Sequence, residues 1–99
     1  GICFDTSHAN LAENVCDVVK KFKNWVISLH VSDNLGSSDD HNIPGRGNID
    51  WKLFVNTLKS IDYKGVFMLE LLEQGKGWDS QKVLKEALRS VKQIPGLKV

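Results

Sequence analysis

Apolar residues along this chain recur with two different periods, and the two periods alternate. Three short, strongly apolar runs are typical of buried β-strands. Each is followed by a stretch in which apolar residues recur at every third or fourth position, as on one face of a helix. This alternation predicts parallel βαβ units. The predicted strands are residues 2–5, 26–32 and 66–69.

The predicted helices carry their own start signals. Asparagine, aspartate and serine side chains accept hydrogen bonds from the free N–H groups of a first helical turn, and such residues precede each apolar stripe. Pro95 and Gly96 follow the last stripe and are expected to end that helix. The predicted helices have apolar stripes over residues 11–22, with Asn10 as N-cap, and over residues 51–61, with Asp50. The last has its stripe over residues 83–91 and is expected to begin after Asp79 or Ser80 as N-cap.

The connections between these elements are unequal. The links from helix to strand are short, whereas residues 33–49, between the second strand and its helix, exceed the usual connection of about two to six residues. In parallel α/β folds such loops lie at the carboxyl ends of the strands, where ligands bind. This polar loop is therefore a candidate functional segment, in which Asp33 is expected to brace the turn after the strand.

Composition restricts the class of protein. The 99 residues are 41% hydrophobic and 25% charged, the balance of an ordinary globular chain. With 13 basic and 12 acidic side chains the net charge is +1, which gives no overall attraction for nucleic acid. The apolar runs are shorter than the roughly 20 residues that cross a bilayer, so no membrane association is expected. Cys3 and Cys16 lie in apolar segments and are expected to be buried free thiols, which favours a cytoplasmic location.

Three ionisable residues lie at the ends of the predicted strands. Asp5 ends the first, His30 lies near the end of the second, and Glu70 follows the third. An apolar strand end is an unfavourable place for a charge, and parallel strands would bring all three side chains to one point. One nitrogen and several oxygen ligands suit a divalent ion such as Mn²⁺, Zn²⁺, Mg²⁺ or Fe²⁺. Each residue also has a structural alternative: Asp5 as a cap, His30 as a hydrogen-bonded core histidine, and Glu70 as the partner of a lysine.

Four segments carry a resemblance to a known family: FDTSHAN (residues 4–10), LHVSDN (29–34), DDHNIPGRGNIDW (39–51) and GVFMLELL (65–72). In this order and spacing they resemble the C-terminal part of the xylose-isomerase-like TIM barrels. That superfamily contains sugar isomerases and epimerases, 2-keto-sugar 3-epimerases, inosose dehydratases and endonuclease IV-type apurinic endonucleases. Its matching segments are Asp-Thr-x-His, His-x-x-Asp, Asp-x-His followed by Pro-Gly-x-Gly-x-Ile-Asp-Trp, and a final strand that ends in Glu.

The resemblance implies an α/β fold made of the three C-terminal βα units of a (β/α)8 TIM barrel, with parallel strands and outer helices. A complete barrel has eight strands and about 250 residues, so residues 1–99 are expected to be the C-terminal part of a single barrel domain. Three strands alone leave unpaired edges. The rest of the barrel, or another chain, is therefore expected to complete the sheet and to supply the family's fourth metal ligand, a glutamate.

The resemblance also implies roles for particular residues. Asp5, His30 and Glu70 match the family's ligands for a divalent metal ion, and Glu70 also matches a glutamate that moves the proton beside a sugar carbonyl through an enediolate. His8 matches a histidine that contacts the substrate or a further metal; its alternative is a solvated loop histidine. Arg46 is either a contact to a substrate oxygen or phosphate or a surface arginine. The implied function is a metal-dependent isomerase or epimerase of a sugar or sugar phosphate, in which this chain alone would be inactive.

Two other functions stay open within the superfamily. In the endonuclease branch an Asp-x-His pair holds a further zinc ion, and Asp39 and His41 match that pair. These two residues are therefore substrate contacts in one interpretation and second-metal ligands in the other. Pro44 and Arg46 fit the sugar enzymes better, and the lysines of residues 20–23 lie away from the expected catalytic face, so nucleic acid is the less favoured partner. A member that kept the fold and lost catalysis would be a binding module.

Overall fold

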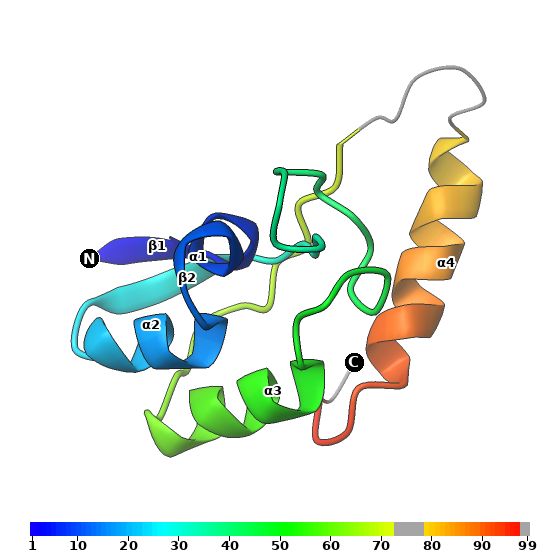
Figure 1. The fold of residues 1–99 in the computed structure, drawn as a ribbon. Helices are drawn as coiled ribbons and strands as arrows, with labels where there is room; N and C mark the ends of the chain where they lie inside the picture. Colours follow the sequence, from blue (N-terminus) through cyan, green and yellow to red (C-terminus); the bar gives the residue numbers. More distant parts are fainter. Residues whose placement is uncertain (73–78, 98–99) are drawn as a thin grey trace.

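The computed structural model describes residues 1–72 and 79–97. Figure 1 shows α2 and α3 side by side beneath two short strands, with α4 set apart from them. Within the described residues no helix is long and apolar enough to cross a membrane. The elements in chain order are β1 (Ile2–Asp5), α1 (Thr6–Ala12), α2 (Val15–Lys21), β2 (Val26–His30), α3 (Trp51–Ser60) and α4 (Ser80–Lys92).

The strands β1 and β2 lie side by side and run parallel, as predicted. Their register places Phe4 opposite Leu29 and Asp5 opposite His30. Because parallel strands end at the same edge of a sheet, the last residues of the two strands are neighbours. The α/β class with parallel strands and outer helices is therefore confirmed.

The third predicted strand pairs at a single position. Leu69 bridges Val31 in the parallel direction, with Val31 N–H donating to Met68 O at 2.7 Å and Glu70 N–H donating to Val31 O at 2.8 Å. The prediction of a regular strand over residues 66–69 is thus wrong in extent. Its direction and its place beside β2 are correct, and these two features position Glu70.

The strand β2 also ends earlier than predicted, at His30 instead of residue 32. The N–H of Ser32 donates to the Thr6 hydroxyl at 3.0 Å, and the N–H of Asp33 donates to Asn42 O at 2.8 Å. These backbone groups leave the sheet for polar partners on α1 and in the loop.

The prediction of one helix over residues 11–22 is wrong, because the segment forms two helices. Asp5 caps α1, and the Asn14 side chain accepts hydrogen bonds from two N–H groups of the first turn of α2. Asn10, the predicted N-cap, lies inside α1. The apolar spacing continues across this break and therefore does not reveal it. The residue that indicates the break is Asn14, because its short polar side chain competes with helical hydrogen bonding.

The other two helices begin where the sequence predicts. Asp50 caps α3 by accepting from the N–H of Leu53 at 3.0 Å. Asp79, one of the two residues predicted, caps α4. Each aspartate satisfies N–H groups that a first helical turn leaves without an intrahelical partner, so both starts follow from residue type alone.

The hydrophobic core lies between the strands and the helices α2 and α3. Phe4, Leu29 and Phe54 are buried, and the rings of Phe4 and Phe54 stack with 6.3 Å between their centroids. Successive strand residues face opposite sides, so Cys3 faces away from this core and is exposed. The prediction of two buried thiols is wrong for Cys3 and right for Cys16, and burial raises the pKa of the Cys16 thiol.

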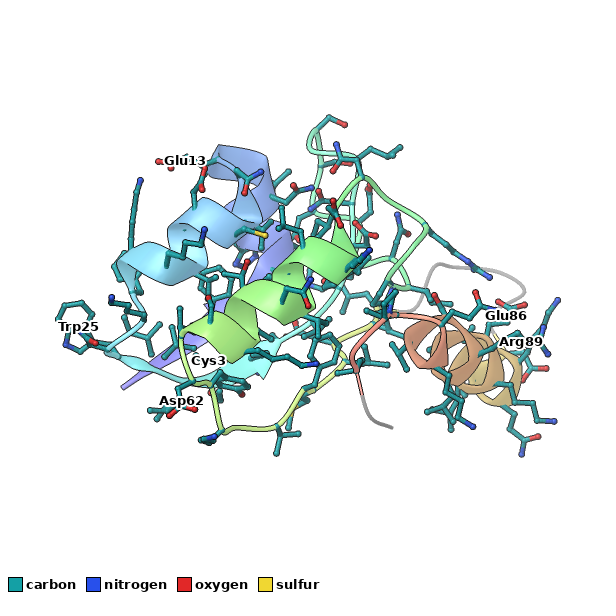
Figure 2. The ribbon with its side chains drawn as sticks, turned by 90° about the horizontal axis from the view of Figure 1, so that it is seen from below. Cys3, Glu13, Trp25, Asp62, Glu86 and Arg89 are labelled. Atoms are coloured by element: carbon teal, nitrogen blue, oxygen red, sulfur yellow. The ribbon has the colours of Figure 1, made fainter. Side chains whose placement is uncertain are left out.

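Large apolar side chains are exposed away from the core. Ile27 is 68% exposed, Val66 67% and Met68 52%. Figure 2, a view from below, shows the Trp25 ring projecting from the turn before β2. Covering apolar surface stabilises a protein by about 25 cal/mol per Å², so this surface is suited to packing against further polypeptide.

Candidate metal centre at the strand ends

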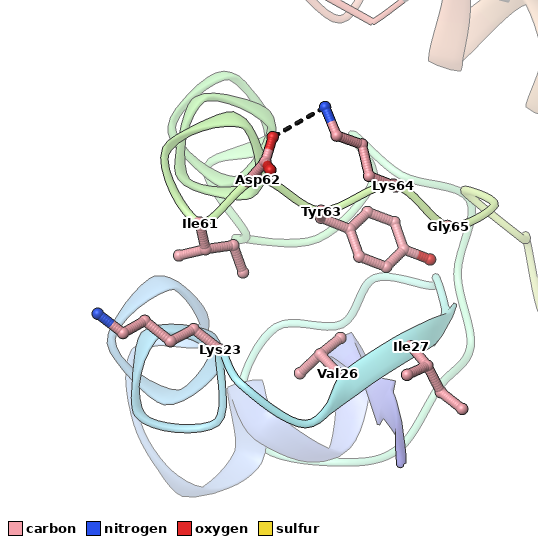
Figure 3. Close-up of a pocket in the computed structure, with 8 residues that line it drawn as sticks. All are labelled: Lys23, Val26, Ile27, Ile61, Asp62, Tyr63, Lys64 and Gly65. Carbon is pink, nitrogen blue, oxygen red and sulfur yellow. Dashed lines mark ion pairs between the residues drawn. The ribbon is translucent and has the colours of Figure 1, made fainter.

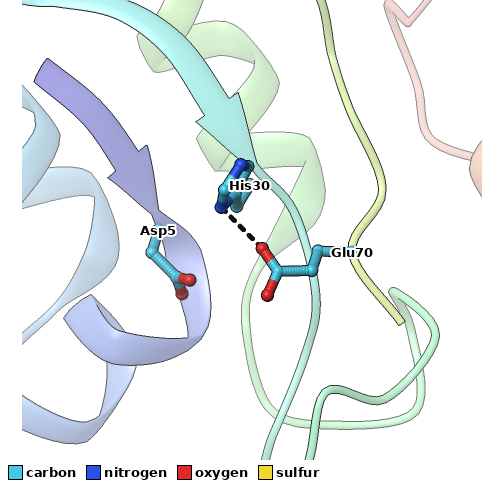
Figure 4. A group of neighbouring side chains, drawn as sticks. All are labelled: Asp5, His30 and Glu70. Atoms are coloured by element: carbon cyan, nitrogen blue, oxygen red, sulfur yellow. Dashed lines mark ion pairs between the residues drawn. The ribbon is translucent and has the colours of Figure 1, made fainter. Parts of the chain in front are cut away.

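Asp5, His30 and Glu70 lie together at the carboxyl ends of the strands, with their side chains pointing toward one another (Figure 4). Each offers one ligand atom, and these atoms all lie within 4.8 Å of one another. His30 Nδ1 lies 2.5 Å from Glu70 Oε2. The structure thus brings together the three residues that the sequence places at strand ends. Metal binding by them stays a prediction.

The backbone fixes where each of these side chains starts. Asp5 and His30 face each other in the β1–β2 register, and Glu70 directly follows the bridge between Val31 and the third segment. Asp5 Oδ1 also accepts from the N–H of His8 at 2.9 Å, so the structural alternative of a helix cap is correct as well. A carboxylate has two oxygens that accept ligands or hydrogen bonds, so capping does not exclude metal binding by Asp5.

The long loop folds back toward this group. Asp39 lies between two imidazoles: its Oδ2 is 2.9 Å from His8 Nε2, and its Oδ1 is 3.3 Å from His41 Nδ1. His41 Nε2 in turn lies 3.4 Å from Glu70 Oε1. Carboxylates and imidazoles therefore alternate in one connected group from His8 to Glu70.

Arg46, in the same loop, is held against α4. Its Nη2 donates to Glu86 Oε2 at 2.8 Å, and the Ser90 hydroxyl donates to the carbonyl of Pro44. These contacts attach the loop to α4. A substrate contact by Arg46 stays a prediction; Glu86 engages one nitrogen of its guanidinium, which has five N–H donors in all.

His8 has a pKa raised above its usual value. The hydrogen bond between its ring and Asp39 is the largest cause, and the negative charge of Asp5 adds to it. The folded chain therefore favours protonated His8. The stabilising interaction is complete below the ordinary histidine pKa of about 6.5, and it is lost as the pH rises through the raised value.

In the metal-free protein, we expect an NMR titration of the His8 ring to give a pKa above the ordinary histidine value. Asp39→Asn should lower that pKa, because it removes the largest cause of the shift. Asp40→Asn, the same change one residue along, is the control and should leave it close to wild type. The effect on stability is small, because His8 is largely exposed. An Asp39→Asn variant with an unaltered His8 pKa would contradict the observed contact.

Sequence reasoning missed a buried polar cluster beside the site. Thr6 Oγ1 donates to Ser32 O at 2.7 Å, and the Ser7 and Ser32 hydroxyl oxygens lie 2.5 Å apart. All three side chains are buried, and they join the first turn of α1 to the chain just beyond β2. In the sequence, the feature that could have indicated this cluster is the pair of hydroxyl residues, Thr6 and Ser7, directly after Asp5.

Two hollows of about 380 Å³ each lie along the strands. One follows β1, and its lining includes Asp5 and His8. The other lies at the start of β2, where Figure 3 shows it with the Asp62–Lys64 ion pair of 2.8 Å. None of the predicted site residues lines this second hollow. The candidate centre therefore belongs to the carboxyl ends of the strands.

The donors of the candidate centre fit a divalent cation. One imidazole nitrogen and the carboxylates of two acidic residues match the ligand preferences of Mn²⁺, Zn²⁺, Mg²⁺ and Fe²⁺. The three side chains are only partly buried, which leaves space for further ligands. Catalytic metal sites keep such an open position for water or substrate.

Parallel strands, outer helices and ligand-type side chains at the strand carboxyl ends define the class of protein, a βα-barrel type of fold with its candidate centre where such barrels bind ligands. The sequence model of one family, the xylose isomerase-like TIM barrel, matches residues 1–94. The chain belongs to this family.

Known proteins match the chain over part of their own length. Uncharacterized protein MJ1311 of Methanocaldococcus jannaschii is 38% identical over 94 residues, which are 92% of this chain and 32% of that protein. Uncharacterized protein y4fM of Sinorhizobium fredii is 31% identical over 65 residues, 65% of this chain and 21% of that protein. The crystal structure of a D-tagatose 3-epimerase-like protein superposes with a TM-score of 0.66 at 35% identity, covering 93% of this chain and 36% of that one. The chain thus spans between 21% and 36% of the length of these three proteins.

Proposed function

We propose that this chain contributes three metal ligands to a divalent-metal-dependent sugar isomerase or epimerase. The observation that carries the proposal is the convergence of Asp5, His30 and Glu70, whose ligand atoms lie within 4.8 Å of one another. Membership of the xylose isomerase-like family and similarity to a D-tagatose 3-epimerase-like protein support a sugar or sugar phosphate as the substrate.

When bound, a divalent ion supplies positive charge that polarises the sugar carbonyl. Glu70 then accepts the proton from the carbon beside that carbonyl, and the electron pair left behind moves into an enediolate. A proton returned to the former carbonyl carbon, together with transfer of the hydroxyl proton to the former carbonyl oxygen, gives the isomer. A proton delivered to the opposite face of the same carbon, by a carboxyl group that the rest of the barrel would supply, gives the epimer. In the structure His30 and His41 contact the two oxygens of Glu70. His41, which is not one of the three proposed ligands, would continue to orient the Glu70 carboxylate with the metal bound.

We also propose that further polypeptide completes both the sheet and the site. In the described residues β1 pairs on one side only, with β2. The hollow along β1 is lined by Ile2, Cys3, Phe4 and Asp5 among others. A strand added at this edge would bring a carboxylate beside Asp5 as the fourth ligand. It would come from the rest of the barrel or from another chain.

A second candidate function is an endonuclease IV-type apurinic endonuclease with several zinc ions. The contacts of Asp39 with His8 and His41 favour it, since these three residues offer ligands for a further ion. However, the ring centroids of His8 and His41 are 6.4 Å apart. In the part of the chain that the structure describes, only Asp5, His30 and Glu70 meet the spacing of a metal site. One metal ion is the better supported number.

Metal analysis of the natural gene product that contains these residues separates the candidates. About one tightly bound ion, together with conversion of a ketose or ketose phosphate from a panel, would support the proposal. Three zinc ions and cleavage of an abasic oligonucleotide would establish the endonuclease instead. A protein without metal and without either activity would be a non-catalytic binding member of the family.

A further inference from the structure

Asp33 begins the long loop, and its carboxylate accepts four hydrogen bonds although the residue is fully buried. Oδ1 accepts from the N–H of Asn34 at 2.9 Å and of Ile49 at 3.3 Å. Oδ2 accepts from the N–H of Gly45 at 2.9 Å and from the Trp51 indole at 2.8 Å. The donors come from both ends of the loop and from the start of α3. The Asp33 carboxylate thus joins the start of the loop to its end, and we call this junction of residues 33–34 with residues 45–51 the neck of the loop. These bonds confirm the bracing role predicted for Asp33.

The backbone of Asp33 holds the middle of the same loop. Its N–H and its carbonyl exchange hydrogen bonds with Asn42 at 2.8 and 2.9 Å. Asn42 directly follows His41, which has a left-handed φ of 53° and is 7% exposed. The position of the His41 ring, 3.4 Å from Glu70, therefore depends on a segment that is tied to Asp33 at several points.

We infer that Asp33 is a positioning residue, which holds His41 and Asp39 in place beside Glu70. The inference rests on the function proposed above, in which Glu70 carries the proton. A buried carboxylate is costly unless hydrogen bonds satisfy it, so the four donors and the carboxylate hold one another in a single arrangement. Groups that orient the residues around a metal centre change its affinity or activity without reaching the metal or the substrate.

Asp33→Asn in the natural gene product tests the inference. The amide keeps the shape but replaces one acceptor oxygen by a donor, so two of the four N–H groups lose their acceptor. We expect kcat/KM to fall about 10- to 100-fold and the ring resonances of His41 to shift or broaden in histidine-labelled protein, while the bound metal is retained. Asp50→Asn is the matched control, because asparagine also caps helices. Asp50→Asn should leave both kcat/KM and the His41 ring resonances unchanged.

A double-variant comparison separates positioning from a general loss of stability. In a His41→Ala background, Asp33→Asn should lower kcat/KM by less than about twofold, because the residue through which it acts is already gone. The unfolding temperature should fall equally in both backgrounds. If Asp33→Asn does not fold, Trp51→Phe replaces it in this experiment, because it removes one hydrogen-bond donor to Asp33 Oδ2. It should also lower kcat/KM and shift the His41 resonances.

Equal losses of kcat/KM in both backgrounds, or unchanged His41 resonances, would overturn the positioning role. The resonances also distinguish failure of this inference from failure of the proposed function. If the wild-type protein converts no sugar and the His41 resonances still respond to Asp33→Asn, the function is wrong and the positioning of His41 stands.

Discussion

His30→Ala is expected to remove tight metal binding from the natural gene product and, with it, sugar isomerase or epimerase activity. His30 supplies the imidazole nitrogen of the three-residue group and contacts Glu70 at 2.5 Å. Its loss removes one ligand and also the group that orients another. Changes beyond the direct ligands of a metal already cost about 10- to 100-fold in affinity, so we expect a loss of more than about 100-fold. Metal content after dialysis and calorimetric titration with Mn²⁺ or Zn²⁺ measure it.

His8→Ala is the matched control for this experiment. His8 lies 3.7 Å from Asp5 but outside the three-residue group, so about one ion should stay bound while catalysis weakens. Asp5→Asn and Glu70→Gln should lose metal as His30→Ala does. Unchanged metal content in all three ligand variants would show that the candidate site is wrong.

The candidate centre could be predicted because it depends on strand direction more than on strand length. Asp5 and His30 end two apolar runs that lie in successive βα units, and parallel strands share one carboxyl edge. To bring Glu70 to the same edge, the third segment needed only to lie beside the second strand. A single bridge at Val31 provides this, so Glu70 is in place although the predicted strand before it is wrong in extent.

The contacts of the polar loop could not be predicted from the same pattern. Asn10 has the residue type of a helix cap, yet its amide donates to Asn34 Oδ1 and Asn48 Oδ1, each at 2.7 Å. Arg46 meets Glu86, 40 positions along the chain. Residue types show which polar groups need partners, but the path of an irregular backbone selects those partners. That path has no repeating period that a sequence could display.

Gly47→Ala is expected to destabilise the protein by about 4 kcal/mol, the sum of a steric clash and of lost hydrogen bonds in a buried site. A Cβ here would lie 2.2 Å from Asn34 O and 2.3 Å from Asp33 Oδ1. The Asn34 carbonyl cannot move aside easily, because it accepts from the N–H of Asn48 at 2.8 Å. The Asp33 carboxylate is fixed by its own four donors. The neck of the loop must therefore open to admit one methyl group.

The free energy of unfolding in urea measures this effect, with Gly36→Ala as the comparison. Gly36 lies in the same loop with a φ of 85°, and the nearest atom to its Cβ would be Asn48 Nδ2 at 3.3 Å, the end of a side chain. Alanine at Gly36 thus meets backbone strain of about 1 to 2 kcal/mol without a clash against the neck. If the Gly47 variant proved no less stable than the Gly36 variant, the neck would tolerate opening, and Asp33 could not hold His41 beside Glu70 in the way the structure shows.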